Sequence, residues 1–354
     1  MRRRQKEEKR LQRQIFLFIV GMSLVIILIP SLLVLGFKQG GQVEEAAARQ
    51  ETIRLDPEAG EPLVTVYLSQ EKRVIQVPLE QYVRGVVAAE MPIDFELEAL
   101  KAQAIASRTY IVQRLILGDF SDVPAGAMVS DTVQHQAYLD ENTLRARWGL
   151  AYEKNMAKLT KAVAETRGKV ITYKGKPIYA TFFSTSNGYT ENAHEYWHGN
   201  ALPYLKSVPS PWDARSPKFQ ATVKLPLEKF LAKLSLKPEV TATTDGRPWI
   251  EVVSKTTGHR VKEVRIGDKL FSGREIREAL GLNSSDFTVR VNGDELEFTT
   301  NGYGHGVGMS QYGADGMAKE GKKAEEIIRY YYQGVELQDY RQWIKQTAKN
   351  DSQN

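Results

Sequence analysis

The chain has 354 residues, no cysteine and a formal net charge of +5. The lack of cysteine excludes disulfide bonds, thiolate nucleophiles and thiolate metal ligands. The charge gives no indication of nucleic-acid binding, because residues 1–14 carry seven basic and two acidic residues and the remaining 41 of each sign cancel. The length is enough for one large domain or two moderate ones.

Residues 15–37 follow the basic stub as 23 uncharged residues, which predicts a single transmembrane helix. The positive-inside rule places residues 1–14 in the cytoplasm and the rest of the chain outside. A cleaved signal peptide is the alternative, but its apolar core would be shorter and a small-residue cleavage site should follow. Residues 38–62 are expected to form a polar linker and residues 345–354 a polar tail.

Residues 63–344 are therefore expected to form an extracytoplasmic domain of the α+β class, with helices and antiparallel sheets mixed along the chain. A second or inserted α/β lobe is expected around residues 220–300. Hairpins are predicted for 63–68 with 73–77, 169–173 with 177–183, 250–254 with 260–266, and 287–291 with 295–299. Helices are predicted at 79–89, 96–117, 141–166, 225–236, after Ser272 in a capping box with Glu275, at 310–319 and at 324–332.

Glu90 is the carboxylate that stands out, at the end of the apolar run Val86 to Ala89 and two residues before Pro92. Proline disfavours helix at the residue before it, so Glu90 should lie at the helix C-terminus. The helix dipole and the apolar neighbours both disfavour the ionised form there, which raises the pKa of the carboxyl group. Glu90 is then either a general acid or an ordinary glutamate at a helix end.

Three other features are candidates for a site. Residues 184–188 (Ser-Thr-Ser-Asn-Gly) end an apolar strand and form either a polar rim or an ordinary loop. Glycines alternate over residues 302–308, which lets the backbone bend or approach another group closely, and His305 lies in the middle. Arg108, on the second helix, is either an exposed cation or points toward Glu90.

His194-Glu195-Tyr196-Trp197-His198 matches the zinc peptidase pattern H-E-x-x-H. That pattern requires a long helix, on which both histidines share one face, and a third ligand. Gly188, Gly199 and Pro203 make such a helix unfavourable here, so a zinc peptidase is kept only as the alternative function.

Several motifs together resemble the stage II sporulation protein D family, the SpoIID/LytB-domain peptidoglycan lytic transglycosylases. The resemblance runs from about Leu63 to Leu337 and adds the basic stub and membrane span. The motifs that carry it are residues 86–92 (VVAAEMP), 101–110 (KAQAIASRTY), 183–188 (FSTSNG) and 302–313 (GYGHGVGMSQYG).

The resemblance implies a membrane-anchored enzyme that cleaves peptide-stripped glycan strands and acts in forespore engulfment on the mother-cell side of the sporulation septum. It implies two partners, the amidase stage II sporulation protein P and the membrane protein stage II sporulation protein M, and no cofactor. It assigns Glu90 as the catalytic acid. It also implies cleft or substrate-binding roles for Arg108, Ser184, Asn187, Tyr303, His305, Gln311 and Tyr312.

Some members of this family carry cysteines near the position of His135 that suit zinc. This chain has Ser130 and Gln136 in that neighbourhood and no cysteine, so we expect no such zinc site. Most glycosidases need two carboxylates, whereas the sequence offers one prominent carboxylate, Glu90. A lytic transglycosylase needs only one, because the sugar's own hydroxyl replaces water. A non-catalytic cell-wall binding or scaffold protein remains a further alternative.

Overall fold

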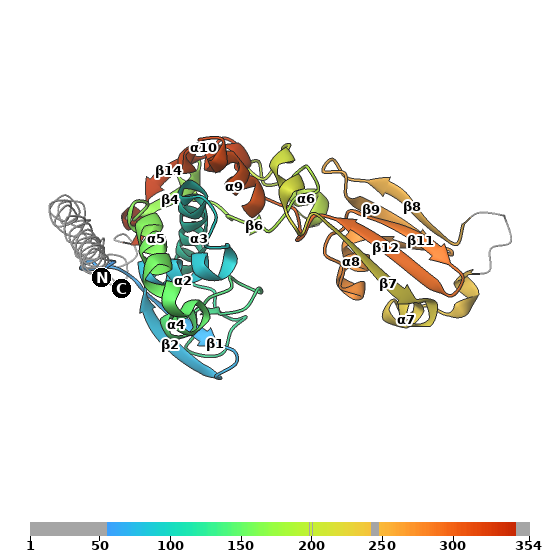
Figure 1. Cartoon of the computed structure of the whole chain (residues 1–354), viewed down its shortest axis with the longest axis horizontal. Coiled ribbons are helices and arrows are strands. Elements are labelled where there is room, and N and C mark those ends of the chain that lie inside the picture. The colour runs from blue at the N-terminus through green and yellow to red at the C-terminus, as the bar shows by residue number, and fades with distance from the viewer. Residues whose placement is uncertain (1–54, 198, 200, 242–247, 345–354) are drawn as a thin grey trace, which may run out of the picture. The chain divides into compact units, whose positions relative to one another are not determined.

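A computed structural model describes residues 55–197, 199, 201–241 and 248–344 (Figure 1). Helices and mainly antiparallel strands are mixed along this part of the chain, as the predicted α+β class requires. Within it, no helix is long and apolar enough to cross a membrane. Four predicted segments lie wholly or partly outside the described residues. They are the stub at 1–14, the membrane span at 15–37, the linker up to residue 54 and the tail at 345–354.

The buried hydrophobic residues form two clusters. The large core contains residues from Leu55 to Leu205 and again from Val307 to Tyr340. The small core contains residues between Phe230 and Phe298, all of them within the predicted lobe around 220–300. The chain thus leaves the large core, builds the small one and returns.

A hairpin and a helix open the large core. β1 (Leu63–Leu68) pairs antiparallel with β2 (Arg73–Pro78), and α2 (Leu79–Glu90) follows directly. These three elements confirm the prediction. A short strand that was not predicted, β3 (Val129–Ser130), pairs parallel with β1.

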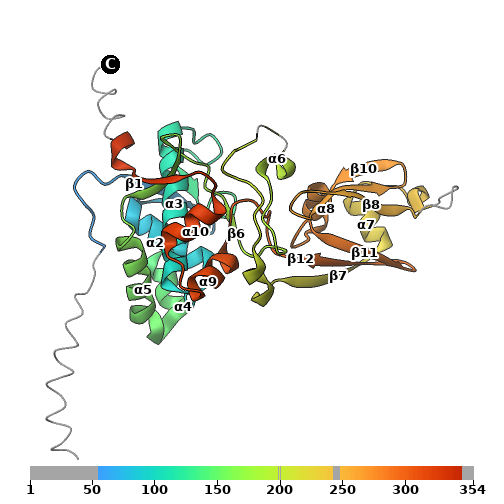
Figure 2. The same ribbon diagram turned by 90° about the horizontal axis from the view of Figure 1, so that it is seen from above.

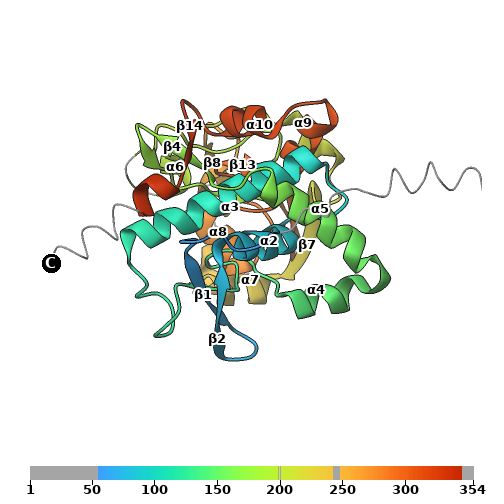
Figure 3. The same ribbon diagram turned by 90° about the vertical axis from the view of Figure 1, so that its left-hand side faces the viewer.

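Helix α3 (Leu97–Leu117) crosses the large core and confirms the second predicted helix. It is buried on most of its faces, because small residues such as Ala99, Ala102 and Ala106 let neighbouring elements approach closely. Figures 2 and 3 show these neighbours around α3. They are α2, α5 (Tyr152–Ala164), α9 (Gln311–Lys319), α10 (Ala324–Tyr331) and β4 (Lys169–Tyr173).

The helix predicted at 141–166 is in fact two helices. α4 (Glu141–Trp148) ends at Gly149, a short 3₁₀ turn follows, and α5 begins at Tyr152. Gly149 has φ 49° and ψ −123°, a conformation that glycine adopts far more readily than other residues. The prediction of one continuous helix was wrong because it ignored this glycine.

The hairpin predicted at 169–183 is only partly present. β4 pairs with β5 (Lys176–Pro177) over two residues, and its longer partner is β14 (Glu336–Asp339), which was not predicted. The end of the predicted second strand, β6 (Phe182–Phe183), instead pairs parallel with β13 (Met309–Ser310). This long-range pairing brings the 184–188 motif beside the glycine-rich motif.

The small core is built from two three-stranded antiparallel sheets and two helices. Four of its strands match the predicted ones to within two residues at each end, and α8 begins with the predicted Ser272–Glu275 capping box. The sheets are β11 (Phe287–Asn292), β12 (Glu295–Asn301) and β7 (Gln220–Pro226), and β10 (Lys269–Ser272), β9 (Val261–Ile266) and β8 (Ile250–Lys255). The helices are α7 (Leu227–Lys233) and α8 (Gly273–Leu280).

The helix predicted at 225–236 begins later than expected. Leu225 and Pro226 belong to β7, which pairs with β12 along its whole length and reaches Glu295. Pro226 is then the residue before the first turn of α7. Pairing with a strand seventy residues away, which no local pattern reveals, decided the conformation of this segment.

Candidate active site

Glu90 is the last residue of α2, as predicted. The helix stops there because Met91, preceding Pro92, is extended, and its N–H donates to the carbonyl of Val87 at 3.1 Å. Val86 and Val87 are fully buried, whereas Glu90 itself is only partly buried. The helix therefore presents the carboxyl group at the edge of an apolar core.

Two hydrogen bonds fix the Glu90 carboxyl group. The backbone N–H of Ala137 donates to Oε1 at 2.9 Å, and Nε2 of Gln311 donates to Oε2 at 3.3 Å. Burial raises the pKa of Glu90, and the two hydrogen bonds lower it by less, so that the pKa is raised overall. The direction and its main cause, apolar surroundings, agree with the prediction. The Ala137 donor is a backbone group, and nothing in the sequence marked it.

Gln311 reaches Glu90 because it is the first residue of α9. Ser310 caps that helix, its hydroxyl oxygen accepting the N–H of Gly313 at 3.2 Å. The side chain of Gln311 is almost fully buried and also contacts Gln103 of α3. The end of the glycine-rich motif and the helix that carries Glu90 therefore meet, although they lie 221 residues apart.

Tyr312 and Ser184 lie next to this contact. The N–H of Tyr312 donates to the carbonyl of Ser184 at 3.1 Å, and its ring packs edge-on against Phe95 with 4.9 Å between ring centroids. Ser184 contributes a hydroxyl that is partly exposed and lies 3.4 Å from that of Thr185. The 184–188 motif thus borders the Glu90 site through its first residue.

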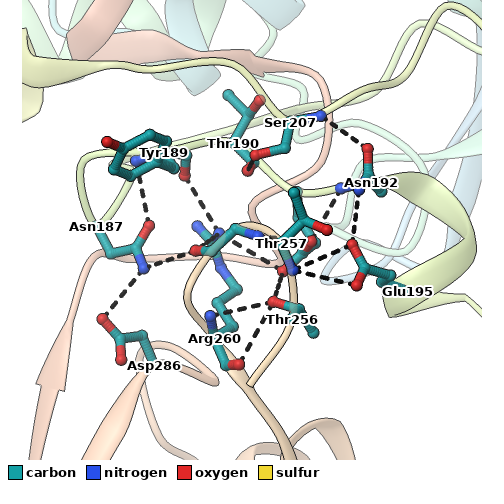
Figure 4. A network of polar contacts seen from close by, with 12 residues as sticks. Asn187, Tyr189, Thr190, Asn192, Glu195, Ser207, Thr256, Thr257, Arg260 and Asp286 are labelled. Carbon is teal, nitrogen blue, oxygen red and sulfur yellow. Dashed lines mark hydrogen bonds and ion pairs between the residues drawn. The ribbon is translucent and has the colours of Figure 1, made fainter. Parts of the chain in front are cut away.

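Asn187, by contrast, bonds to residues next to the small core. Its Nδ2 donates to the carbonyl of Gly258 at 3.0 Å and to Asp286 at 3.1 Å (Figure 4). Both partners belong to the 220–300 region. The structure therefore gives Asn187 a role in joining the two cores rather than contact with Glu90.

A buried ion pair lies at the same junction and was not predicted. Glu191 and Arg260 are both about 1% exposed, with 3.9 Å between Oε2 and Nη1. Arg260 also donates to the carbonyls of Tyr189 and Gly258, and Figure 4 shows it among these groups. Burial raises the pKa of Glu191 and lowers that of Arg260. Neither residue lies in a recognisable sequence pattern, so no signal could have found the pair.

His305 is enclosed by aromatic rings and is neutral at physiological pH. Burial, aided by the nearby Arg277 and Arg260, lowers its pKa to about 3. Its Nδ1 accepts the N–H of Val307 at 3.0 Å, and the ring of Trp197 lies 5.3 Å away between centroids. His305 therefore orders the glycine-rich segment, whose backbone it bonds.

Tyr303 is the exposed residue of this segment. It retains 41% of its accessible surface, and the ammonium group of Lys218 lies 4.9 Å above its ring. Its backbone bonds both ways with Thr185. Tyr303 is thus available to a ligand, although the structure does not join it to Glu90.

Arg108 is not a cleft residue. Its side chain is fully buried, and its guanidinium group donates to both carboxylate oxygens of Glu80 at 2.6–3.1 Å and to the carbonyl of Lys169. Glu80 lies in the first turn of α2, about 15 Å along the helix from Glu90. Both alternatives for Arg108, an exposed cation and a side chain that points toward Glu90, were wrong, because Glu80 pairs with it inside the core.

Asp213 is a buried carboxylate that the sequence did not single out. It accepts hydrogen bonds from the N–H and hydroxyl of Ser186 and from the hydroxyls of Ser210 and Ser310, at 2.5–2.9 Å. Burial raises its pKa. Asp213 thereby ties the 184–188 motif to the start of α9. A loop rich in proline and aromatic residues was the only signal at this position.

The zinc peptidase pattern does not form its site among the described residues. α6 (Ala193–Tyr196) has four residues and ends before His198, which lies outside them. Glu195 bonds to Asn192 and to the N–H of Thr257, which lowers its pKa. Among the described residues, no three His, Asp or Glu side chains lie close enough together to hold a metal ion.

The loop before Ala137 is held by hydrogen bonds. Nδ1 of His135 lies 2.8 Å from the hydroxyl of Ser130 and its Nε2 lies 3.2 Å from Asp122. Gln136 accepts the hydroxyl of Tyr82 at 3.3 Å. Burial lowers the pKa of His135. These contacts fix the backbone that presents the Ala137 N–H to Glu90.

Comparison with known proteins gives consistent matches. The family model described as stage II sporulation protein (SpoIID) matches residues 67–173. Stage II sporulation protein D of Bacillus subtilis (strain 168) is 45% identical over 89% of this chain and 93% of its own. Its counterpart in Bacillus amyloliquefaciens is 42% identical over 92% of this chain and 96% of its own.

A more distant relative is an amidase enhancer of Bacillus subtilis (strain 168), which is 30% identical over 73% of this chain and 40% of its own length. The first two matches extend over nearly the whole of both proteins, including the segments that carry Glu90 and Gln311. The chain therefore belongs to the stage II sporulation protein D family.

Proposed function

We propose that the protein is a peptidoglycan lytic transglycosylase and that Glu90 is its general acid and base. The observation that carries the proposal is the Glu90 carboxyl group, whose burial raises its pKa while two donors, Ala137 and Gln311, fix its orientation. A carboxylic acid that stays protonated at higher pH than usual can donate a proton to a leaving group.

In the proposed reaction, Glu90 protonates the glycosidic oxygen between N-acetylmuramic acid and N-acetylglucosamine as the bond from C1 breaks. The Glu90 carboxylate then accepts the proton of the muramic acid C6 hydroxyl. The C6 oxygen bonds to C1 and closes a 1,6-anhydro ring. Glu90 gives up one proton in the first step and regains one in the second. The reaction therefore balances without water.

The surroundings of Glu90 favour this reaction over hydrolysis. The carboxyl group of Glu90 is hydrogen-bonded to Ala137 and Gln311, and the nearby Asp94 and Glu96 are exposed. Hydrolysing glycosidases in general place two carboxyl groups across the bond that they break. A single carboxyl group suffices when the sugar supplies its own nucleophile.

Family membership and the sequence support a proposal for the biological setting. We propose that residues 15–37 anchor the protein in the membrane, that the enzyme acts outside it on peptide-stripped strands at the sporulation septum, and that engulfment depends on this cleavage. Its proposed partners are the amidase stage II sporulation protein P and stage II sporulation protein M. A relative named for enhancing an amidase supports a pairing with an amidase.

The test is a product analysis with the full chain on purified glycan strands, with and without stem peptides. We expect saccharides with 1,6-anhydro ends from the wild-type protein. Glu90→Gln should fold normally and cleave about 10²–10⁴-fold more slowly, the usual contribution of a general acid or base. Mass spectrometry of the products measures both.

Each other result has a clear meaning. Reducing ends would keep Glu90 as the acid but require water and a second carboxylate. Unchanged cleavage by Glu90→Gln would remove Glu90 from the mechanism. Glycan binding without any product, equal in both proteins, would favour a scaffold protein, and peptide products sensitive to chelators would favour a zinc peptidase.

A further inference from the structure

A chain of side-chain hydrogen bonds runs inward from Glu90. Nε2 of Gln311 lies 3.3 Å from Glu90 and 3.4 Å from Oε1 of Gln103. Nε2 of Gln103 in turn donates to the hydroxyl oxygen of Ser107 at 3.0 Å. Gln103 and Ser107 lie one turn apart on α3, the central helix of the large core.

All three polar side chains behind Glu90 are enclosed. Gln103 and Ser107 are 0% exposed and Gln311 is 5% exposed. Buried amides keep the orientation that satisfies their donors and acceptors, because an unpaired buried polar group is costly. Burial therefore favours the orientations in which these amides stay paired.

The amide orientations can be followed along this series of hydrogen bonds. The amide nitrogen of Gln103 donates to the Ser107 hydroxyl, and the amide oxygen of Gln103 lies toward Nε2 of Gln311. An oxygen there requires a donor, so Gln311 presents its NH₂ group, and the second hydrogen of that group reaches Glu90. If the Gln311 amide rotated, its oxygen would face two other oxygens.

We propose that Gln103 is a positioning residue, which orients the Gln311 amide so that an N–H faces Glu90. This inference rests on the proposed function of Glu90 as acid and base. An N–H donor stabilises the carboxylate and opposes the effect of burial. Without the oxygen of Gln103, the Gln311 amide is free to rotate and accept a hydrogen bond from the protonated carboxyl group.

The test is Gln103→Met, which keeps the length of the side chain and removes the acceptor. The Glu90 carboxyl group then titrates at higher pH, and the alkaline limb of the cleavage rate moves up by about half a pH unit. Carbon-13 NMR of the full chain labelled at glutamate carboxyls measures the titration directly. Glu90 is assigned by the signal missing in Glu90→Gln.

Gln113→Met is the matched control. Gln113 lies on the same helix, is partly buried and donates to the carbonyl of Pro177 at 3.4 Å. It should leave both the titration of Glu90 and the alkaline limb unchanged. Gln103→Met could instead lower the cleavage rate equally at every pH and leave the titration of Glu90 unchanged. That result would overturn the proposal and show that Gln103 only packs in the core.

A double variant tests the route of the effect. If Gln103 acts through Gln311, then adding Gln103→Met to Gln311→Met produces no further shift. Additive shifts would contradict the proposal. If Gln103→Met does not fold, Ser107→Ala removes the partner that orients Gln103, and it should move the titration in the same direction. Absence of any shift in that variant would also contradict it.

The titration separates this inference from the proposed function. Normal cleavage by Glu90→Gln would refute Glu90 as the catalytic acid, whatever the titration shows. Lost cleavage by Glu90→Gln together with an unmoved Glu90 titration in Gln103→Met would refute only the positioning role.

Discussion

The Glu90 carboxyl group is held between an apolar core that disfavours its charge and two N–H donors that favour it. Such a balance suits a group that must be an acid in one step and a base in the next. Glu90 lies on α2, and its two donors lie far from it in sequence, in the loop before α4 and at the start of α9. The sequence alone could identify the carboxyl group but not the donors.

The raised pKa of Glu90 predicts a pH-dependent stability cost. The pKa of such a group is higher in the folded than in the unfolded protein. Its contribution to stability is complete at a pH below its pKa in the unfolded protein, and it is lost as the pH rises through its pKa in the folded protein. Glu90→Gln, which cannot ionise, should therefore gain stability relative to wild type as the pH rises from 4 to 8. Denaturant unfolding across this range measures the difference, and a difference independent of pH would contradict the prediction.

Arg108 contributes to stability through its buried pair with Glu80. Arg108→Met leaves the Glu80 carboxylate buried without its partner and should cost about 3–5 kcal/mol of unfolding free energy. Arg145→Met, which breaks an exposed pair with Glu141, should cost less than about 1 kcal/mol. Denaturant unfolding distinguishes the two, and equal small losses would show that the buried pair is not important.

At the scale of elements, close contacts explain why the segment 302–308 is rich in glycine. A Cβ at Gly306 would lie 2.3 Å from the guanidinium carbon of Arg260, and one at Gly308 would lie 2.0 Å from the carbonyl oxygen of Thr181. The segment therefore runs in direct contact with β6 and with the lobe junction. The sequence left open whether the backbone bends here or approaches another group, and the structure shows a close approach.

Gly308→Ala should destabilise the protein by more than the backbone strain of a positive φ at one residue. Gly308 has φ +83°, and the added methyl group would also overlap backbone. Gly321→Ala is the control, because Gly321 has φ +88° with no atom within 4 Å, and should cost only about 1–2 kcal/mol. If thermal or denaturant unfolding gave the same loss for both, the contact with Thr181 would not matter.

At the scale of the whole molecule, the two hydrophobic cores are joined by buried polar contacts (Figure 4). The 184–188 motif and the loop that follows it bond the turn between β8 and β9. Asn187 and Glu191 bond to Gly258 of that turn, and Arg260 of the turn donates to the carbonyl of Tyr189. This loop also bonds the glycine-rich segment, since the N–H of Glu191 donates to the carbonyl of Gly306 at 2.7 Å. The small core is thereby coupled to the segment that leads to Gln311.

Arg260→Met should uncouple the two cores. It leaves Glu191 buried without its cation and removes the bonds to Tyr189 and Gly258. Calorimetry of the full chain should then show the small core unfolding at a lower temperature, as a separate transition. Lys255→Met, which breaks a more exposed pair with Asp286, should leave the unfolding profile unchanged. A single shared transition in Arg260→Met would contradict this role.

Local signals determined much of this protein. Hydrophobic periodicity and proline positions predicted α2, α3 and the placement of Glu90, and turn residues predicted the β11–β12 hairpin, because these structures depend on neighbours in sequence. Only the tertiary structure decided the pairing of β4 with β14, the burial of Arg108 and the donors of Glu90. Each of these depends on contacts between residues far apart in the chain, for which a local pattern carries no information.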